Sequence, residues 1–473
     1  MVVEGGIRFD AELIRRYDRR GPRYTSYPTA LQFSDDFDVV QYLQAVRGSN
    51  DDPVPAPLSL YLHIPFCERP CFYCACTRII TQNHAKAAAY LARLYREIEL
   101  QAELFDRDRE VLQLHLGGGT PTFLSLAELR ELMDMLGHHF TLIRSPTRDY
   151  SIEVDPRSVD ADTVRGLFDL GFNRISFGVQ DLNPQVQHAV NRMQSAESIR
   201  ALMQAARAAG FSSINMDLIY GLPFQTPASF QTTLQAIVEM RPDRLAVYSY
   251  AHMPQQFKAQ RLIADYTLPD AETKLSLLGL AVSRLTQAGY EYIGMDHFAL
   301  PDDSLARALH QGTLQRNFQG YSTGADCDLV GMGMSAISLV RDTYSQNVKS
   351  LQGYSACLDA GQLAVCRGWV MTSDDRVRRA VLQQLTCEGR VSFARYARRF
   401  GIDCENYFAN ELCALKPMAN DGVLRFDDEG LVLTPAGRLL TRAVAMVFDA
   451  YLRPASPLQP PNADKTARYS RLI

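Results

Sequence analysis

Four cysteines lie within ten residues of the sequence, and thiolates so close together can do metal or redox chemistry. They are Cys67, Cys71, Cys74 and Cys76, directly after the apolar run LSLYLHIPF. Such a group could close a zinc site, form disulfides or hold an iron–sulfur cluster. Structural zinc sites usually combine two separated CxxC halves, and this sequence contains no second half. The spacing therefore favours one loop wrapped around an iron–sulfur cluster, with zinc and then a disulfide pair as lesser alternatives.

Glycines and polar residues follow several β-rich runs farther along the chain. The run HLGGGTPTFL contains Gly118, Gly119 and Thr120, and glycines let a backbone approach a ligand closely. Further polar residues lie at or just beyond later β-rich runs: Glu153, Gln180, Arg192 and Asp217. Taken singly, each fits a tight turn, a capped loop or a solvated side chain. Their recurrence at equivalent places favours a lined cavity.

An alternation of short β-rich runs and longer amphipathic segments would position these residues. The strand candidates are LSLYLHI, VLQLHLGG, YSIEVDP, NRISFGVQ, SSINMDLIYG and RLAVYSYAH, with YEYIGMDHFA as a seventh. Such a repeat predicts parallel strands covered by helices. Six or seven units are too few for a full eight-stranded barrel but enough for a partial one. We therefore predict an α/β fold, a partial (β/α)6 TIM-like barrel with its chemistry at the carboxyl ends of the strands.

Two flanking regions lack this alternation of β-rich and amphipathic segments. Residues 1–50 are expected to lie over the mouth of a catalytic domain at 51–365. Residues 366–455 have a mainly helical pattern and include a hairpin-like GVLRFDDEGLVL, and helices and hairpin together resemble a winged helix. Residues 456–473 form a Pro-rich tail. Winged helices often bind DNA, but residues 371–450 carry as many acidic as basic side chains. A DNA-reading module normally shows an excess of Lys and Arg, so a packing or lid role is favoured.

The composition is that of an ordinary soluble globular protein. Of 473 residues, 47% are hydrophobic and 22% are charged, and the net charge of −4 gives no electrostatic case for nucleic acid or an anionic membrane. The N-terminus lacks the apolar core of a signal peptide, and no stretch approaches about 18 consecutive apolar residues. We therefore expect a cytoplasmic protein, in which clustered cysteines indicate metal or redox chemistry rather than disulfides.

At the cysteine loop the chain resembles the radical S-adenosylmethionine (SAM) enzymes, which share three cysteines at this spacing after the first barrel strand. The resemblance implies that Cys67, Cys71 and Cys74 bind a 4Fe-4S cluster whose remaining iron chelates SAM. An electron from the cluster would cleave SAM, giving a 5′-deoxyadenosyl radical that abstracts hydrogen. Tyr73 would pack near the adenine. Cys76 is then not an iron ligand: it is either a small side chain buried beside the cluster or a residue that acts in turnover or supports the loop.

The resemblance narrows, over nearly the whole chain, to the oxygen-independent coproporphyrinogen III dehydrogenases (oxidases) of anaerobic haem synthesis. It is carried by GPRYTSYPTALQF, LYLHIPFC, CAC, GMDHFA, RNFQGYST and RYSRLI. The implied reaction is oxidative decarboxylation of the ring A and ring B propionates of coproporphyrinogen III to vinyl groups, giving protoporphyrinogen IX. The radical would remove a propionate β-hydrogen, and loss of CO2 and one further electron would leave the double bond. The implied partners are this substrate, an electron donor and an unknown electron acceptor, with no nucleic acid and no membrane; a monomer is expected.

Two propionates need two radical-generating events, so the resemblance implies two SAM molecules. It suggests a first SAM beside Tyr61, Gly118, Glu153 and Ile337, and a second beside Tyr73, Gly119, Thr120, Gln180, Arg192, Asp217 and Ala251. Tyr61, His63 and Cys76 are the candidate catalytic residues. His63 lies on the same strand face as Tyr61, and a hydrogen-bonded core histidine is the alternative.

The binding site of a substrate with four propionates is expected to contain positively charged side chains. The N-terminal run of candidates is Arg15, Arg16, Arg19, Arg20 and Arg23. Arg23, followed by aromatic residues rather than charges, is the best single choice. The alternative is a solvated helix face.

Two rival functions have recognisable features. The haem-chaperone branch of the same family shares the three-cysteine loop but is generally shorter at the N-terminus and lacks the fourth cysteine. Here CAC and GPRYTSYPTA both favour the dehydrogenase. A metal-sensing or DNA-binding protein is disfavoured by the balanced charge and by the large βα region.

Overall fold

The computed structural model describes residues 6–323 and 327–452, together with Tyr469 and Arg471. Apart from these two residues, the tail predicted at 456–473 lies outside the described residues. None of the helices described is long and apolar enough to cross a lipid bilayer.

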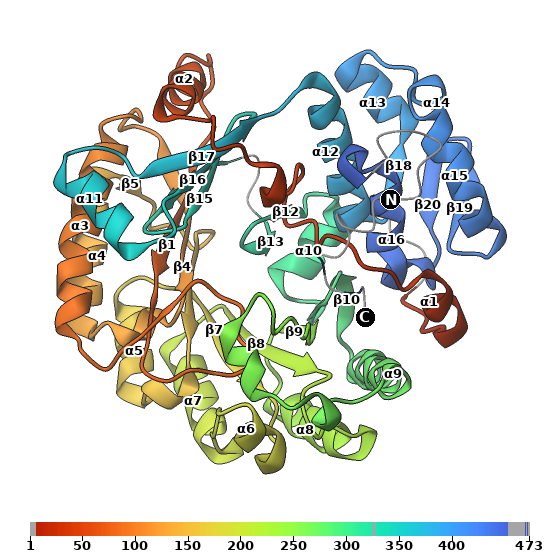
Figure 1. The fold of residues 1–473 in the computed structure, drawn as a ribbon, viewed down its shortest axis with the longest axis horizontal. Coiled ribbons are helices and arrows are strands. Elements are labelled where there is room, and N and C mark those ends of the chain that lie inside the picture. Colours follow the sequence, from red (N-terminus) through yellow and green to blue (C-terminus); the bar gives the residue numbers. More distant parts are fainter. Residues whose placement is uncertain (1–5, 324–326, 453–468, 470, 472–473) are drawn as a thin grey trace.

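A mostly parallel sheet forms the centre of the molecule. Its parallel strands are, in spatial order, β9 (Arg244–Ser249), β8 (Ser213–Tyr220), β7 (Arg174–Gln180), β6 (Asp149–Val154), β4 (Glu110–Gly118), β1 (Leu58–Ile64) and β14 (Asp328–Met332). The helices that follow the first six of these strands along the chain are α3 (Ala85–Ala102), α4 (Leu126–His139), α5 (Ala161–Asp169), α7 (Ala196–Ala209), α8 (Pro227–Met240) and α9 (Ala271–Gln287). They cover the outer side of the sheet (Figure 1). The predicted partial (β/α)6 barrel is confirmed.

Antiparallel strands extend the sheet at both ends. Beyond β14 lie β15 (Ile337–Val340), β16 (Thr343–Asn347) and β17 (Val365–Val370). At the other end, β11 (His297–Ala299) pairs with β9 and with β10 (Glu291–Gly294). In the described part of the chain β10 and β17 do not pair, so the sheet stays open.

The prediction of a single seventh strand at YEYIGMDHFA is wrong. The segment folds as the hairpin β10–β11, in which Tyr292 pairs with Phe298. The chain reverses at Gly294 and Met295, whose φ angles are 152° and 52°. Positive φ is easy for glycine and uncommon for methionine, so only the glycine carried a turn signal.

Polar residues line the inside of the barrel because side chains alternate between the two faces of each strand. In β6, Ile152 and Val154 are buried against the helices, whereas Ser151 and Glu153 face inward. The inward faces of β4, β6, β7, β8 and β9 enclose a cavity of about 150 Å³. Its polar lining includes Gln113, His115, Ser151, Glu153, Arg174, Ser176, Asn215, Asp217, Arg244 and His297.

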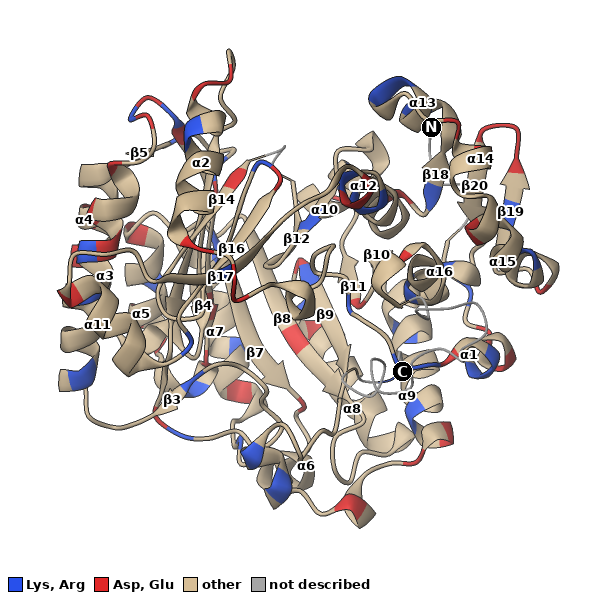
Figure 2. Ribbon diagram, turned by 45° about the horizontal axis from the view of Figure 1, so that its top comes forward, with Lys and Arg blue, Asp and Glu red and all other residues tan. Residues whose placement is uncertain are grey.

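A mainly helical unit follows β17, as predicted. Its helices are α12 (Ser373–Glu388), α13 (Phe393–Phe400), α14 (Cys404–Tyr407), α15 (Ala409–Asn420) and α16 (Thr441–Phe448). The predicted hairpin is β19 (Leu424–Asp427) with β20 (Gly430–Leu433), joined by β18 (Arg390–Ser392) in a small antiparallel sheet. Blue and red segments both occur along these helices, in keeping with the balanced charge of the unit (Figure 2).

The N-terminal segment packs against this helical unit although the two are far apart in sequence. Ile14 and Tyr17 of α1 (Ala11–Tyr17) share an apolar cluster with Val377 and Val381 of α12. The remaining elements are α2 (Val39–Asn50), β2 (Phe66–Cys67), β3 (Ile79–Ile80), β5 (Thr141–Leu142), α6 (Pro184–Ala189), α10 (Ser304–Gln311), β12 (Gln315–Asn317), β13 (Gly320–Ser322) and α11 (Leu351–Asp359), with short 3-10 turns between them.

Candidate active site

The cysteine loop leaves the carboxyl end of β1 and is closed by a short parallel ladder between β2 and β3. The turn after β4 packs directly on it, because the Gly119 N–H donates to the Ile64 carbonyl at 2.8 Å. A Cβ atom on Gly119 would lie 2.7 Å from the Phe66 carbonyl oxygen, so this close approach requires glycine. The loop is therefore fixed at the carboxyl ends of β1 and β4.

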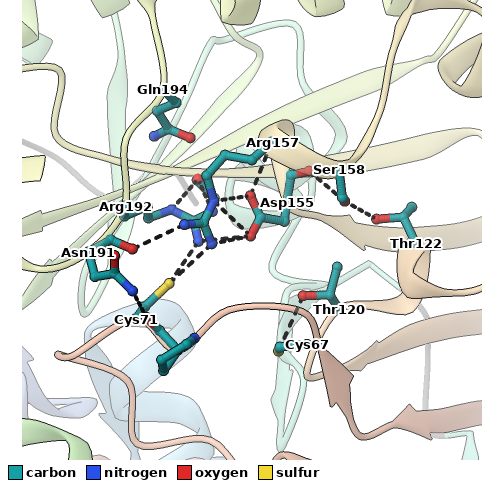
Figure 3. Close-up of polar contacts among 12 residues, drawn as sticks. Cys67, Cys71, Thr120, Thr122, Asp155, Arg157, Ser158, Asn191, Arg192 and Gln194 are labelled. Carbon is teal, nitrogen blue, oxygen red and sulfur yellow. Dashed lines mark hydrogen bonds and ion pairs between the residues drawn. The ribbon is translucent and has the colours of Figure 1, made fainter. Parts of the chain in front are cut away.

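Cys71 lies against two arginines that share one carboxylate (Figure 3). Arg157 Nη2 and Arg192 Nη1 each lie 3.3 Å from Cys71 Sγ. The Asp155 carboxylate lies 2.6 Å from the first guanidinium and 3.2 Å from the second. Burial alone would raise the pKa of Asp155, but the two guanidinium groups hold it below its usual value. A thiolate at Cys71 would thus receive charge-assisted hydrogen bonds.

Cys67 and Cys74 lie in unlike surroundings. Cys67 Sγ lies 3.3 Å from the Thr120 hydroxyl, and burial raises the pKa of Cys67 to about 11 although Thr120 opposes the shift. Hydrogen bonding from Cys76, aided by the Arg78 cation and opposed by burial, lowers the pKa of Cys74 to about 6. Cys74 is therefore the member of the pair that ionises more easily.

Cys76 is exposed, so the interpretation of this residue as a buried small side chain is wrong. Its backbone N–H lies 3.4 Å from Cys74 Sγ, which makes it part of the support of the loop. Arg78 adds to that support by donating to the carbonyl groups of Cys71 at 3.2 Å and Cys74 at 3.0 Å. The fourth cysteine thus contacts Cys74 through both its side chain and its backbone N–H.

The donor set fits a cluster better than a single zinc ion. Among residues 6–323 and 327–452, no three His, Cys, Asp or Glu side chains gather closely enough to hold one metal ion. Zinc needs its ligands to converge on one point, whereas the thiolates of an iron–sulfur cube bind different iron atoms. Cys67, Cys71 and Cys74 therefore suit a 4Fe-4S cluster, and each is a free thiol.

Tyr61 and His63 are joined to each other on β1. The Tyr61 hydroxyl lies 3.0 Å from His63 Nδ1, and His63 Nε2 lies 2.9 Å from the Thr77 carbonyl oxygen. A carbonyl oxygen only accepts, so Nε2 carries the proton and Nδ1 accepts from Tyr61. Burial lowers the pKa of His63, which favours this neutral ring. His63 is thus hydrogen-bonded at both nitrogens, as the core-histidine alternative required.

A second histidine, His115, lies between Tyr61 and Glu153. The rings of Tyr61 and His115 stack at 5.8 Å with an interplanar angle of 14°. His115 lies 2.6 Å from the Ser151 hydroxyl and 3.2 Å from Glu153 Oε1, while the Gly118 N–H donates to Glu153 Oε2 at 3.3 Å. Burial would raise the pKa of Glu153, but His115 and Gly118 outweigh it and hold the pKa below its usual value. Tyr61, Gly118 and Glu153 therefore lie together.

Gln180 and Asp217 face the barrel from neighbouring strands. Gln180 has a φ of 69°, and its side-chain oxygen is buried without a hydrogen-bond partner in the described part of the chain. Asn215 donates to Asp217 at 2.9 Å. Burial, reinforced by Glu153, raises the pKa of Asp217 to about 6. A buried acceptor without a donor is a place where a ligand could bind.

The other predicted SAM neighbours fall into two groups. Gln260 donates to the carbonyl oxygens of Tyr73 at 2.9 Å and Ala251 at 3.2 Å, so it joins these two residues across the barrel mouth. Ile337, at the start of β15, packs in the same apolar cluster as Tyr61. The structure thus brings Tyr73 together with Ala251, and Ile337 together with Tyr61.

Sequence reasoning missed Arg78, His115, Arg157 and Gln260. Arg157 carried a usable signal, because it follows Glu153 and Asp155 just beyond a strand end. His115 could have been found from its position two residues before the glycine turn. No pattern in the sequence indicated the roles of Arg78 and Gln260, which depend on folded loops.

The N-terminal arginines are separated by the structure. Arg15 forms an ion pair with Glu272 at 2.6 Å, and Arg16 forms one with Asp421 at 2.6 Å. Both pairs are exposed, as expected of a solvated helix face. Of the remaining three, Arg19 and Arg20 are exposed, and the half-buried Arg23 donates to the Ser249 carbonyl oxygen at 3.1 Å at the end of β9.

Comparison with known proteins places the chain in a family. It matches the Radical SAM superfamily over residues 61–237 and the HemN C-terminal domain over residues 371–440. The oxygen-independent coproporphyrinogen III oxidase of Pseudomonas aeruginosa is 53% identical over 446 residues, covering 94% of this chain and 96% of that protein. The chain belongs to the oxygen-independent coproporphyrinogen III oxidase family. The resemblance read from the motifs is confirmed.

Other members of the oxygen-independent coproporphyrinogen III oxidase family agree in sequence and in structure. The Escherichia coli protein of that name is 48% identical over 453 residues, covering 96% of this chain and 98% of that protein. A solved structure described as coproporphyrinogen III oxidase from Escherichia coli, a radical SAM enzyme, superposes with a TM-score of 0.90 at 47% identity. It covers 95% of this chain and 100% of that one. The family thus matches the chain over its helical C-terminal unit as well as its barrel.

Proposed function

We propose that this chain is a radical SAM oxidoreductase that oxidises coproporphyrinogen III without oxygen in haem synthesis. The observation that carries the proposal is the cysteine loop fixed beside polar strand ends, in a chain similar along nearly its whole length to enzymes of that name. The implied outcome is conversion of the ring A and ring B propionates to vinyl groups, giving protoporphyrinogen IX.

Cys67, Cys71 and Cys74 would hold the 4Fe-4S cluster, with Cys76 left as a support of the loop. When bound, the cluster would supply the electron that cleaves SAM, and the 5′-deoxyadenosyl radical would remove hydrogen from the propionate β-carbon. Loss of CO2 and of one further electron to an acceptor would then leave the double bond. Because two propionates react, two SAM molecules are proposed.

The chain's own residues would bind and orient these groups. Tyr61, Gly118, Glu153 and Ile337 lie together and are proposed for the first SAM, with His63 holding the Tyr61 hydroxyl. The second SAM would contact Tyr73, Gly119, Thr120, Gln180, Arg192, Asp217 and Ala251. The N–H groups of Gly118, Gly119 and Thr120 already donate within the protein, so their carbonyl groups would meet the ligand.

The arrangement of the whole protein follows from the same proposal. Residues 1–50 would lie over the mouth of the barrel at 51–365, with 366–455 as a packing unit rather than a DNA-binding one. An electron donor would reduce the cluster, and the chain would work as a cytoplasmic monomer. Arg23 would contact the substrate.

An anaerobic assay tests the activity. Protein reconstituted with iron and sulfide is incubated with SAM, coproporphyrinogen III, a reductant and cell extract as electron acceptor. Protoporphyrinogen IX should form, and Cys74→Ser protein should form none. If the wild-type protein still releases 5′-deoxyadenosine but makes no protoporphyrinogen IX, the proposed substrate is wrong.

A further inference from the structure

Two cations donate to backbone carbonyl groups at the carboxyl end of β9. Arg23 Nη2 lies 3.1 Å from the Ser249 carbonyl oxygen, and Lys274 Nζ lies 3.2 Å from that of Tyr250. They come from the N-terminal segment and from α9. Ala251, proposed for the second SAM, is the next residue of the chain. This pair, Arg23 and Lys274, is named the rim cations below.

A third cation, Arg442 of α16, holds the segment that carries Arg23. Its guanidinium donates to the Gly21 carbonyl oxygen at 2.9 Å and to that of Pro22 at 3.2 Å. Burial and then the nearness of Arg23 lower the pKa of Arg442 to about 10. The next residue, Tyr24, donates to Asp449 at 2.9 Å. The backbone on both sides of Arg23 is therefore tied to the helical unit, which positions its side chain at the rim.

The rim cations have no carboxylate within ion-pair distance among the described residues. The acidic group that faces Lys274 is Asp18, which is itself 3.5 Å from Arg471. Asp296 faces Arg442 instead. Burial lowers the pKa of Lys274 to about 8, with Asp18 opposing the shift and Arg23 adding to it. Cations held together in partly buried surroundings favour a bound anion, because it replaces the water they have lost.

We propose that the rim cations bind the propionate carboxylates that the reaction leaves intact, so that a tetrapyrrole polycarboxylate is anchored by its unreactive side. This inference rests on the proposed function, since coproporphyrinogen III has four propionates and two of them remain in the product. Arg23 supplies a forked set of N–H donors suited to a carboxylate, and Lys274 supplies a point charge beside it.

The reacting propionates are the poorer occupants of this site. A cation paired with a carboxylate stabilises the charged reactant, and that stabilisation is lost when the carboxylate leaves as neutral CO2. Such pairing would raise the barrier to decarboxylation. A cation paired with a retained carboxylate stabilises the reactant and the product equally and leaves that barrier unchanged. The retained propionates therefore gain affinity at this site without slowing the chemistry.

Porphyrin binding tests the proposal directly. Arg23→Gln and Lys274→Gln keep an N–H donor for the carbonyl groups and remove the charge. The probes are coproporphyrin III, with four propionates, and protoporphyrin IX, which keeps only the two unreacted ones, each titrated by fluorescence against reconstituted protein. Each variant should bind both porphyrins about tenfold more weakly, the usual scale for losing one charge-assisted hydrogen bond.

Arg15→Gln is the matched control, because Arg15 is an arginine of the same segment already paired with Glu272; it should bind both porphyrins as the wild type does. Iron content and the visible cluster absorption should be unchanged in all variants, which shows an intact fold and cluster. A loss for coproporphyrin III alone would mean that the rim cations hold the reacting propionates, and unchanged binding would mean that they hold none. Either result overturns the proposal. Because porphyrin binding is measured apart from turnover, a failure of this proposal can be told from a failure of the proposed function.

Discussion

Replacing Asp217 with asparagine tests the electrostatics of the barrel lumen. Burial, reinforced by Glu153, raises the pKa of Asp217 from 3.8 to about 6, although hydrogen bonds from Asn215 and Ser176 oppose the shift. The change corresponds to about 3 kcal/mol of unfolding free energy. Because the native carboxyl binds its proton more tightly than the unfolded one, this stability is present below about pH 4 and is lost as the pH rises through about 6.

The assay is chemical denaturation of cluster-free wild-type and Asp217→Asn protein, compared at each pH from about 4.5 to about 7.5. Over that range the variant should gain about 2 kcal/mol relative to the wild type, since part of the titration lies below it. Asp160→Asn is the control. Hydrogen bonds from Thr163 lower the pKa of Asp160, so its stability is lost only as the pH falls, and the variant should show no such gain. A flat difference for Asp217→Asn would refute the reasoning.

Four further substitutions give three predictions about the site and the fold around it. Cys76→Ser should retain iron and the visible cluster absorption, whereas Cys74→Ser should lose both; equal iron loss would refute the three-thiolate assignment. Arg157→Gln removes a charged donor from Cys71 and should lower the cluster's midpoint potential by roughly 60 mV in an EPR titration with iron content unchanged; an unchanged potential contradicts this. The buried Glu97 carboxylate of α3 accepts hydrogen bonds from the Gly333 N–H, the Asn347 amide and the Tyr354 hydroxyl. Glu97→Gln puts an amide donor against these donors and should lower the free energy of unfolding by about 1–3 kcal/mol in denaturation of the two proteins side by side. An unchanged free energy of unfolding would contradict this.

The barrel could be predicted because its strands are buried on one face and polar on the other. In NRISFGVQ, Ile175, Phe177 and Val179 are buried, whereas Ser176 and Gln180 face inward. The antiparallel strands at the edges of the sheet were harder to predict, because nothing in the local sequence distinguishes an edge strand from a barrel strand. The hairpin β10–β11 was missed for this reason, since apolar residues lie on both sides of its turn.

The candidate site was predicted where chemistry and spacing coincide, and missed where a role depends on long-range contact. Three cysteines in one loop carry their own signal. Arg157 and Arg192 are instead brought to Cys71 from 86 and 121 residues away. The position of Arg157 beyond a strand end indicated a site residue, and Arg192 was predicted beside SAM, but neither pattern indicated a contact with Cys71. Only the fold shows that both guanidinium groups lie on a thiol.

The two groups of residues around the barrel mouth come from different parts of the chain. The side chains that contact the sulfur atoms of Cys67 and Cys71 from farther along the chain are Thr120, Arg157 and Arg192, all within the residues that match the Radical SAM superfamily. The rim cations depend on the N-terminal segment and on Arg442 of the helical unit. Changes at the rim should therefore alter porphyrin affinity without altering the cluster, and changes around Cys71 should do the reverse. In the proposed arrangement, residues outside the match to the Radical SAM superfamily, Arg23, Lys274 and Arg442, build the substrate site, whereas the cysteine loop and its neighbours within that match hold the cluster.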